Sequence, residues 1–292
     1  MTAVLQTASV EPVAGHRLSL RRFGRNRLAV AGLAVVVLFL LFCFVGPLLY
    51  STDQTHTDLT QVNLAPGGAH WLGTDAVGHD ELGRLMYGGK VSLLVGLAAG
   101  LLATVIGTLW GAVAGYAGGW VDAVMMRVVD AGIAIPALFI LLVVSAITTP
   151  GVPGLIVILG LVSWLVPSRL VRAETLTLKN RDYVLTLRAT GGTHGRAILR
   201  HILPNSVSTI VVAATFQVAD AILLVAYVSY LGLGVQPPST DWGGMLSAGL
   251  TAAYSGRWWL IVPPGLAIIL VVCAFNAIGD GLRDAFDVRG RG

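Results

Sequence analysis

The sequence predicts an all-α membrane protein that crosses the bilayer six times. Of its 292 residues, 55% are hydrophobic and only 12% are charged, whereas about a quarter of the residues in a soluble domain carry a charge. The charges fall between long apolar runs instead of being spread along the chain. Because these runs are continuously apolar and do not alternate, we expect helices and not the strands of a barrel.

Six apolar runs approach or exceed the roughly 20 residues that a helix needs to cross the hydrocarbon core. They are residues 28–49, 91–116, 124–147, 152–170, 207–231 and 260–278. The first run is longer than the apolar part of a signal peptide, and no small-residue cleavage site precedes Ser51, so we interpret it as an uncleaved anchor. Cys43 and Cys273 lie inside runs, which indicates packing residues and no disulfide framework.

The basic residues predict that both termini are cytoplasmic, because Lys and Arg gather on the cytoplasmic side of membrane proteins. With six spans, only Arg84, Lys90 and Arg257 of the 19 Lys and Arg residues fall on the outer side. The others follow the remaining loops and tails and form no compact basic face with aromatic residues, which excludes a nucleic-acid-binding protein.

These assignments divide the chain into four parts. Residues 1–27 are a basic cytoplasmic tail, and residues 28–90 are the first transmembrane helix with an extracytoplasmic segment. Residues 91–281 are a five-helix core that contains the cytoplasmic loop 172–205, and residues 282–292 are a cytoplasmic tail.

Glycines recur along one face of the second run. Gly96, Gly100, Gly107, Gly111 and Gly115 are separated by four or seven residues, and small residues at this spacing let another helix approach closely. The neighbour is either a helix of the same chain or a helix of a second subunit. In both cases we expect the second run to be buried in protein.

The loop between the fourth and fifth runs contains a segment that is too polar to span a membrane and too apolar for a free linker. Residues 181–190 are predicted to form a short helix, which the glycines at 191–192 end. Thr193 can cap a second helix over residues 195–202, and Pro204 is expected to end that helix. A short helix–turn–helix outside the membrane is suited to docking in a groove on a partner protein.

This segment resembles the cytoplasmic coupling loop of the membrane subunits of ABC importers, which carries an EAA triplet, a nearby glycine and a distal HILPN-like end. The matching residues are Arg188, Ala189, Gly191, His201, Ile202, Leu203, Pro204 and Asn205. The triplet itself is replaced by Leu185-Thr186-Leu187. The resemblance implies a set of ATPase-coupling residues, which are Tyr183, Arg188, Ala189, Gly191, Gly192, His201 and Pro204.

Further motifs narrow the resemblance to the permeases of dipeptide and oligopeptide importers. They are HWLGTDAVGHDELGRLMYGGKVSLLVG at 70–96, GYAGGWVDAVMMRVVD at 115–130 and SYLGLGVQPPSTDWGGML at 229–246. The basic entry RRFGRNRLAVAGL is similar to that of the C-type member of the two permease subunits. The resemblance covers nearly the whole chain, but His79 replaces the usual Arg, and Val225 stands where the family often has Glu.

The resemblance implies a type I ABC importer permease fold in the bacterial inner membrane, with a coupling helix between spans four and five. It implies a second homologous permease, two ATPase subunits that hold ATP and Mg, and an extracytoplasmic binding protein. Asp75, Asp80 and Trp242 are then expected to face the binding protein. The expected cargo is a di- or oligopeptide; nickel chelates, haem or another small solute are the alternative.

Asp220 is a carboxylate near the middle of the fifth run, where an ionisable residue is costly and usually functional. It either meets a peptide amino group in the translocation pathway or pairs with a neighbouring subunit. Asp130, near the start of the third run, is interpreted as an interfacial or packing residue.

No motif predicts a catalytic residue, a metal site or a cofactor in this chain. The His and Asp residues of the outer segment match no ligand spacing, and we interpret them as a solvated or receptor-facing loop; they are His56, His70, His79, Asp53, Asp58, Asp75 and Asp80. Gly88-Gly89-Lys90 lacks the first glycine and the Ser or Thr of a phosphate-binding loop.

We therefore expect a transporter subunit and not an enzyme, with ATP hydrolysis in separate partners. The alternative from another class is a secondary transporter that works alone. The runs contain few charges for an ion relay and no inverted repeat of broken helices, which argues against it.

Overall fold

The computed structural model describes residues 22–52, 54 and 57–286, and these residues form helices and loops with no β-strand. The predicted cytoplasmic residues Arg17, Arg21, Arg289 and Arg291 lie outside the described part of the chain, as do Asp53 and His56. The expectation of an all-α protein is confirmed.

Four helical stretches are long and apolar enough to cross a membrane. They are α2 (Arg27–Phe44), α4 (Glu81–Ala117), α12 (Val207–Tyr230) and Trp258–Phe286, in which the turn η3 (Trp258–Leu260) precedes α14 (Val262–Phe286). A short helix, α3 (Gly46–Leu49), continues from α2.

The third and fourth predicted runs each form a pair of helices separated by a bend. The third consists of α5 (Gly119–Ile133) and α6 (Ala137–Thr148), bent by 75°, and the fourth of α7 (Val152–Ser163) and α8 (Leu165–Leu178), bent by 45°. Pro136 stands in the first break and Pro167 in the first turn after the second. Proline lacks an N–H and restricts the residue before it, so both bends lie where a helix cannot continue unbroken. The described residues therefore offer four spans, or six if each bent pair crosses once.

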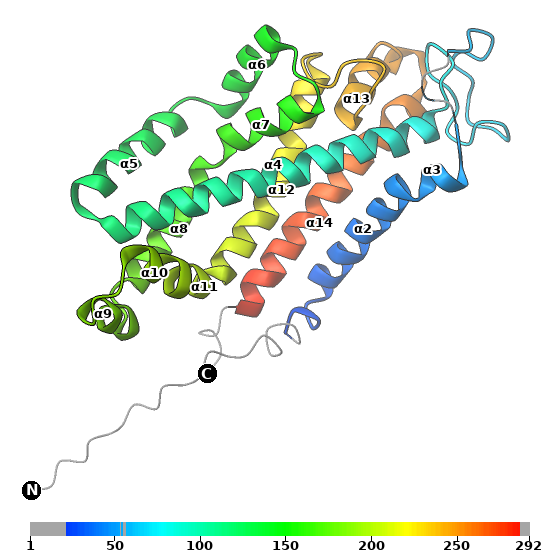
Figure 1. Cartoon of the computed structure of the whole chain (residues 1–292). Helices are drawn as coiled ribbons and strands as arrows, with labels where there is room; N and C mark the ends of the chain where they lie inside the picture. The colour runs from blue at the N-terminus through cyan, green and yellow to red at the C-terminus, as the bar shows by residue number, and fades with distance from the viewer. Residues whose placement is uncertain (1–21, 53, 55–56, 287–292) are drawn as a thin grey trace, which may run out of the picture.

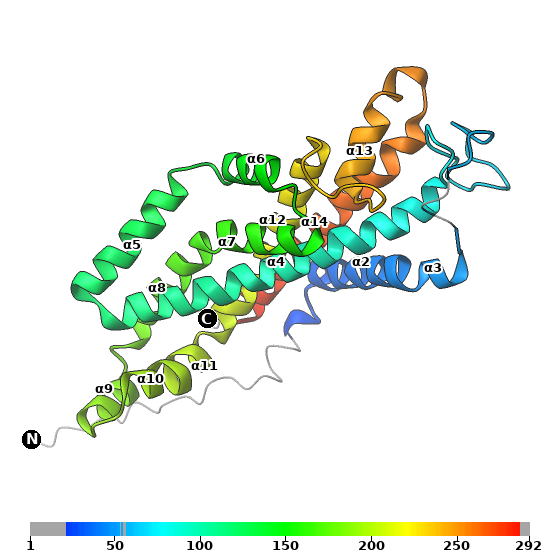
Figure 2. The same ribbon diagram turned by 45° about the horizontal axis from the view of Figure 1, so that its top comes forward.

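Helix α4 is the central element and packs against α7, α8 and α12; α14 lies between α12 and α2. Figures 1 and 2 show α5 and α6 along one side of the bundle and α2 on the other. The side chain of Asp80 begins α4 by accepting a hydrogen bond from the Gly83 N–H at 2.8 Å. The helix therefore starts ten residues before the predicted run, inside the segment that was expected to be an outer loop.

The glycine face of α4 lies against other helices of the same chain. A Cβ added at Gly111 would lie 2.3 Å from the Ser168 carbonyl oxygen of α8, and one added at Gly100 would lie 2.8 Å from Cα of Val218 in α12. Both distances are shorter than real Cβ atoms tolerate. Of the two alternatives for these glycines, packing within one chain is the one observed.

The two ends of the bundle differ in character. One end carries α9 (Asp182–Ala189), α10 (His194–Ala197), the π turn η1 (Ile198–Ile202) and α11 (Leu203–Asn205). The last turn of α14 and the first of α2 lie at this same end (Figure 1). The opposite end carries the loop before α4, together with α13 (Trp242–Leu250) and the turn η2 (Ala253–Ser255).

We expect Gly111→Ala to destabilise the protein by about 1–3 kcal/mol, because the added methyl group meets backbone that cannot move freely. The matched control is Gly195→Ala, where an added Cβ has no atom within 4 Å. In a helix with free space, Gly→Ala normally stabilises. Thermal unfolding of both purified variants in detergent measures the difference, and equal effects of the two changes would contradict the packing described.

Candidate functional site

The helices α9 to α11 form a compact unit, here called the cap, at one end of the bundle. Val184 of α9 and Ile202 of η1 are fully buried, and they pack with Leu178 of α8 and Tyr116 of α4. Thr193 accepts a hydrogen bond from the Arg196 N–H at 3.3 Å, as expected for the N-cap of the second helix. The cap is therefore a folded element with its own small core and not a free loop.

The second helix of the cap differs from the prediction. Helical structure begins at His194, widens into the π turn and continues as α11 to Asn205, so Pro204 does not end it. Pro204 stands in the first turn of α11, where a missing backbone N–H is tolerated. The expectation that Pro204 stops the helix is wrong for this reason.

Two glycines make the turn between α9 and α10, each for a different reason. Gly191 has a φ of +80°, in the left-handed region that favours glycine. Its N–H donates to the Arg188 carbonyl, and the Gly192 N–H donates to the Leu187 carbonyl at 2.8 Å, which is a Schellman motif. A Cβ at Gly192 would lie 2.5 Å from Leu187 Cγ, so Gly192 is required for space.

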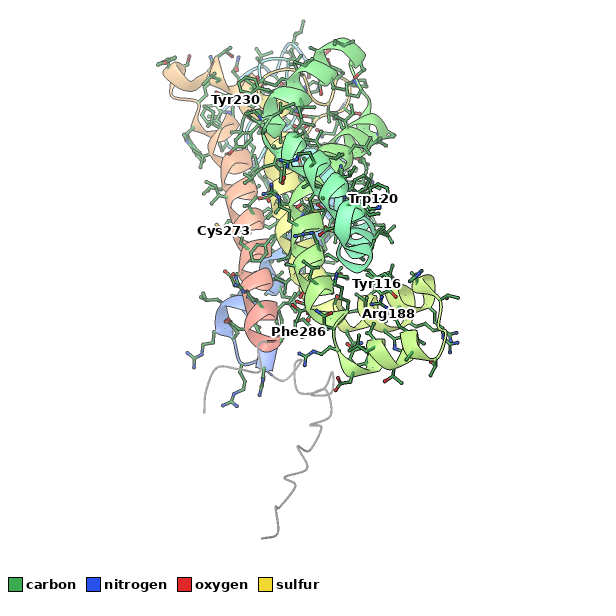
Figure 3. All side chains as sticks on the ribbon, turned by 90° about the vertical axis from the view of Figure 1, so that its left-hand side faces the viewer. Tyr116, Trp120, Arg188, Tyr230, Cys273 and Phe286 are labelled. Carbon is green, nitrogen blue, oxygen red and sulfur yellow. The ribbon has the colours of Figure 1, made fainter. Side chains whose placement is uncertain are left out.

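Tyr116, near the end of α4, joins the cap to the bundle. The Arg188 guanidinium carbon lies 5.8 Å from the centre of the Tyr116 ring, a cation–π distance. The Tyr116 hydroxyl lies 3.3 Å from His194 Nδ1, and Lys179 Nζ donates to the Gly115 carbonyl oxygen at 2.8 Å. Figure 3 shows Tyr116 directly beside Arg188 at the lower end of the bundle. Tyr116 lies in the motif at 115–130, but it was not among the expected ATPase-coupling residues.

The outer surface of the cap combines apolar and basic side chains. Tyr183 is 41% exposed, Leu185 45% and Leu199 62%. The Tyr183 ring lies 6.2 Å from the His201 ring, and partial burial raises the pKa of Tyr183 above its usual value. Its hydroxyl therefore stays protonated near neutral pH. Arg188 and Ala189 are exposed as well.

Asp220 lies in a pocket of about 340 Å³ at the two helix bends. The pocket is lined by residues from the α5–α6 break, among them Pro136, and from the α7–α8 break, among them Leu165. Gln217 and Tyr227 of α12 complete the polar part of its wall. Asp220 is exposed and takes part in none of the ion pairs found within the described ranges. The bends and the carboxylate thus meet at one place, which the straight predicted runs did not show.

Ion pairs between α5 and α8 lie nearer the cap. Arg172 Nη2 donates to Asp122 Oδ2 at 2.6 Å, and the Arg169 guanidinium pairs with Asp130. Asp130 is exposed and is held by this ion pair within the chain. These pairs connect α5 to α8, the helix that leads into the cap.

At the opposite end, the structure corrects the expectation that Asp80 and Trp242 face a docking protein. Trp242 is fully buried: its Nε1 donates to the Leu85 carbonyl oxygen at 3.0 Å, and its ring fills the space left by Gly89. Asp80 is buried and accepts hydrogen bonds from Tyr50 and His70 at 2.9 and 2.8 Å, besides capping α4. Both side chains hold the outer segment together.

Asp75 is committed to a similar network. Its carboxylate accepts from the Arg84 guanidinium at 3.0 Å and contacts His79 Nδ1 at 2.9 Å. Burial, together with the hydrogen bond to Asp80, raises the pKa of Tyr50 to about 12, so Tyr50 remains a donor at neutral pH. Within the described ranges, no group of three His, Cys, Asp or Glu side chains is arranged to hold a metal ion.

Comparison with known proteins matches two family models. Residues 107–292 match the binding-protein-dependent transport system inner membrane component, and residues 17–66 match the N-terminal TM domain of oligopeptide transport permease C.

Individual relatives match over most of their length. An oligopeptide transport system permease protein of Escherichia coli (strain K12) is 41% identical over 93% of this chain and 90% of its own. A dipeptide transport system permease protein of Bacillus subtilis (strain 168) is 38% identical over 91% of this chain and 83% of its own. An oligopeptide transport system permease protein of the same organism is 36% identical over 91% and 87%.

We expect Tyr116→Ala to loosen the cap, because it removes both the ring under Arg188 and part of the buried core. Proteolysis of a locally opened segment follows the population of the open form, so tryptic cleavage within 181–200 should accelerate by at least about tenfold. The control is Trp120→Ala, a nearby aromatic residue at the start of α5 that is 77% exposed. Unchanged cleavage in Tyr116→Ala would show that the cap is held without this residue.

Proposed function

The chain belongs to the family of binding-protein-dependent transport system inner membrane components, and we propose that it forms half of the translocation pathway of an ATP-driven peptide importer. The observation that carries this proposal is the cap. It is folded, joined to the central helix through Tyr116, and exposes Tyr183, Leu185 and Leu199, which no residue within the described ranges covers. An apolar helical surface outside the membrane is suited to a groove on a partner.

The proposed topology has six spans with both termini in the cytoplasm of a bacterial cell, in its inner membrane. Each bent pair then counts as one crossing, and the cap lies on the cytoplasmic side because it carries many of the basic residues. In this topology residues 1–27 and 282–292 are the cytoplasmic tails. Residues 28–90 hold the first span and the outer segment, and residues 91–281 form the five-helix core. Residues 81–90 of the outer segment belong to α4.

On the cytoplasmic side, two ATPase subunits that bind ATP and Mg would receive the coupling residues in surface grooves. These residues are Tyr183, Arg188, Ala189, Gly191, Gly192, His201 and Pro204. Closure of the ATPases on ATP would move the cap. Tyr116 and the Lys179 contact to Gly115 would pass that movement to α4. No cofactor is assigned to this chain, which acts as a transporter subunit and not as an enzyme.

The pocket at Asp220 is proposed as this chain's share of the pathway, completed by a second homologous permease in a heterodimer. A carboxylate beside two bent helices can accept the amino terminus of a peptide. A pairing of Asp220 with the second permease is the competing role. The cargo is proposed from the names of the relatives, which are dipeptide and oligopeptide permeases. An extracytoplasmic binding protein would deliver it at the end that carries Asp75 and α13.

Replacing Gly191 tests the coupling role. We expect Gly191→Val to reduce both co-purification of the ATPases and ATP-driven uptake into vesicles, because a β-branched residue is strained at a φ of +80°. Gly195→Val is the matched control, since its added Cβ meets no atom within 4 Å. Intact ATPase association and uptake in Gly191→Val would contradict the coupling assignment. Uptake driven by an ion gradient without any ATPase would contradict the proposed function itself.

Replacing Asp220 separates its two roles. If it lines the pathway, Asp220→Asn should leave the complex assembled and raise the KM for peptide uptake by about tenfold, as expected for loss of a charge-assisted hydrogen bond. Loss of the second permease from the purified complex would instead assign Asp220 to subunit pairing. Uptake kinetics and size-exclusion chromatography of the same preparation measure both.

A further inference from the structure

A cavity of about 630 Å³ lies at the outer end of the bundle, away from the cap and from Asp220. One wall comes from the outer segment and the first turn of α4, and the other from Pro237 to Ser239, α13 and the residues up to Leu260. Its volume is that of a typical small-ligand site. The wall on the α13 side is largely apolar, with Met245, Ala248 and Leu260.

Glu81 is the unusual residue of this cavity. It is 3% exposed and lines the cavity, yet its carboxylate makes no hydrogen bond or ion pair with any residue that the structure describes. The neighbouring carboxylates of Asp75 and Asp80 are saturated by the donors described above. Arg84, one turn after Glu81, directs its donors to Asp75 and Thr240. A buried carboxylate without a donor is costly.

Two more acceptors on the same wall lack a donor. Gln54 Oε1 and Asn63 Oδ1 are buried and unpaired within the described ranges, and both residues line the cavity. The Gln54 amide nitrogen donates to Thr52 Oγ1. The amide oxygen of Gln54 takes no part in that contact. The same amide lies against Gly83 of α4, where an added Cβ would be 2.3 Å from Gln54 Nε2. Both amide oxygens are closed off from the cavity, so Glu81 is the carboxylate that the cavity presents without a donor.

We propose that this cavity binds the free amino terminus of a short peptide, with the Glu81 carboxylate accepting hydrogen bonds from its ammonium group. An ammonium carries three N–H donors and one positive charge, which suits a buried carboxylate that has no other donor. Arg257 also lines the cavity and forms no ion pair within the described ranges, so it is placed to meet a carboxylate of the same ligand. This inference rests on the proposed function, because it takes a peptide as the cargo.

The volume favours a peptide over a single side chain from a docking protein. A lysine side chain would satisfy Glu81 but would leave most of the 630 Å³ and the guanidinium of Arg257 without a partner. A peptide of two or three residues has both charges and an apolar body for the wall formed by Met245 and Leu260. The cavity would then hold cargo at the outer end before it reaches the pocket at Asp220.

The test needs a readout that belongs to this cavity alone. Ala248 lines the cavity and is exposed, so Ala248→Cys introduces a thiol there; Cys43 is buried, and Cys273 is removed by Cys273→Ala. The complete importer complex in proteoliposomes, without its binding protein, is labelled with a membrane-impermeant maleimide. Tri-alanine with free termini should slow labelling, and N-acetyl-tri-alanine should protect at least about tenfold less well.

Glu81→Gln, which keeps the shape of the side chain, should raise the half-protective concentration of tri-alanine by about tenfold. Asp280→Asn makes the same chemical change at an exposed position in α14, near the cap end of the bundle. This control should leave the half-protective concentration of tri-alanine unchanged. Because Glu81→Gln could disturb folding, Ala248→Phe provides a second route. The larger Phe side chain narrows the cavity from the α13 wall. For this variant the expected result is a raised KM for peptide uptake.

Three outcomes would overturn the assignment: labelling that tri-alanine does not slow, equal protection by the acetylated peptide, or Glu81-dependent protection by the ligand-free binding protein. The last would show that a cation of the binding protein fills the cavity. ATP-driven peptide uptake by the unmodified complex is measured in parallel. Normal uptake without protection defeats only this inference, whereas absence of uptake of any peptide defeats the proposed function.

Discussion

The close approach of α4 to its neighbours is the constraint on which the rest of the structure depends. A Cβ added at Gly111 would lie 2.3 Å from the Ser168 carbonyl oxygen, and one added at Gly107 would lie 2.6 Å from the Trp164 carbonyl oxygen, so α4 approaches the start of α8 more closely than a side chain would allow. In lipid there is little hydrophobic drive between helices, so such contacts provide much of the association through packing. Because α8 runs directly into the cap and α12 carries Asp220, the position of α4 determines where both candidate sites lie.

The sequence predicted the helical class, the apolar runs and the presence of a folded element between the fourth and fifth runs. These features could be predicted because the thickness and apolar character of a bilayer set the length and composition of the helices that cross it. The two bends were not predicted, although Pro136 and Pro167 lie beside them. The length of an apolar run does not determine whether its helix axis changes direction. The early start of α4 was missed because its first turns are polar and depend on Asp80, the N-cap residue of this helix.

Among the site residues, local signals served better than motif positions. The glycines at 191–192 identified the turn of the cap correctly, since a positive φ is a property of the chain itself. Trp242 was expected at a docking surface because it lies in a polar outer segment, but tertiary packing buries it against Gly89. Tyr116 lies in the motif at 115–130, but its contacts with the cap could not be predicted, because its partners Arg188 and His194 are distant along the chain.

Helix α4 has 37 residues, which at 1.5 Å per residue makes it roughly 55 Å long, far more than the roughly 30 Å of a bilayer core. Glu81 stands at its outer end and Tyr116 at the end under the cap. One unbroken helix of this length can carry a movement from one end of the bundle to the other. A tilt of about 5° about one end would displace the other by about 5 Å. In the proposed importer, a movement of the cap would thus reach the outer cavity without any change in the helix itself.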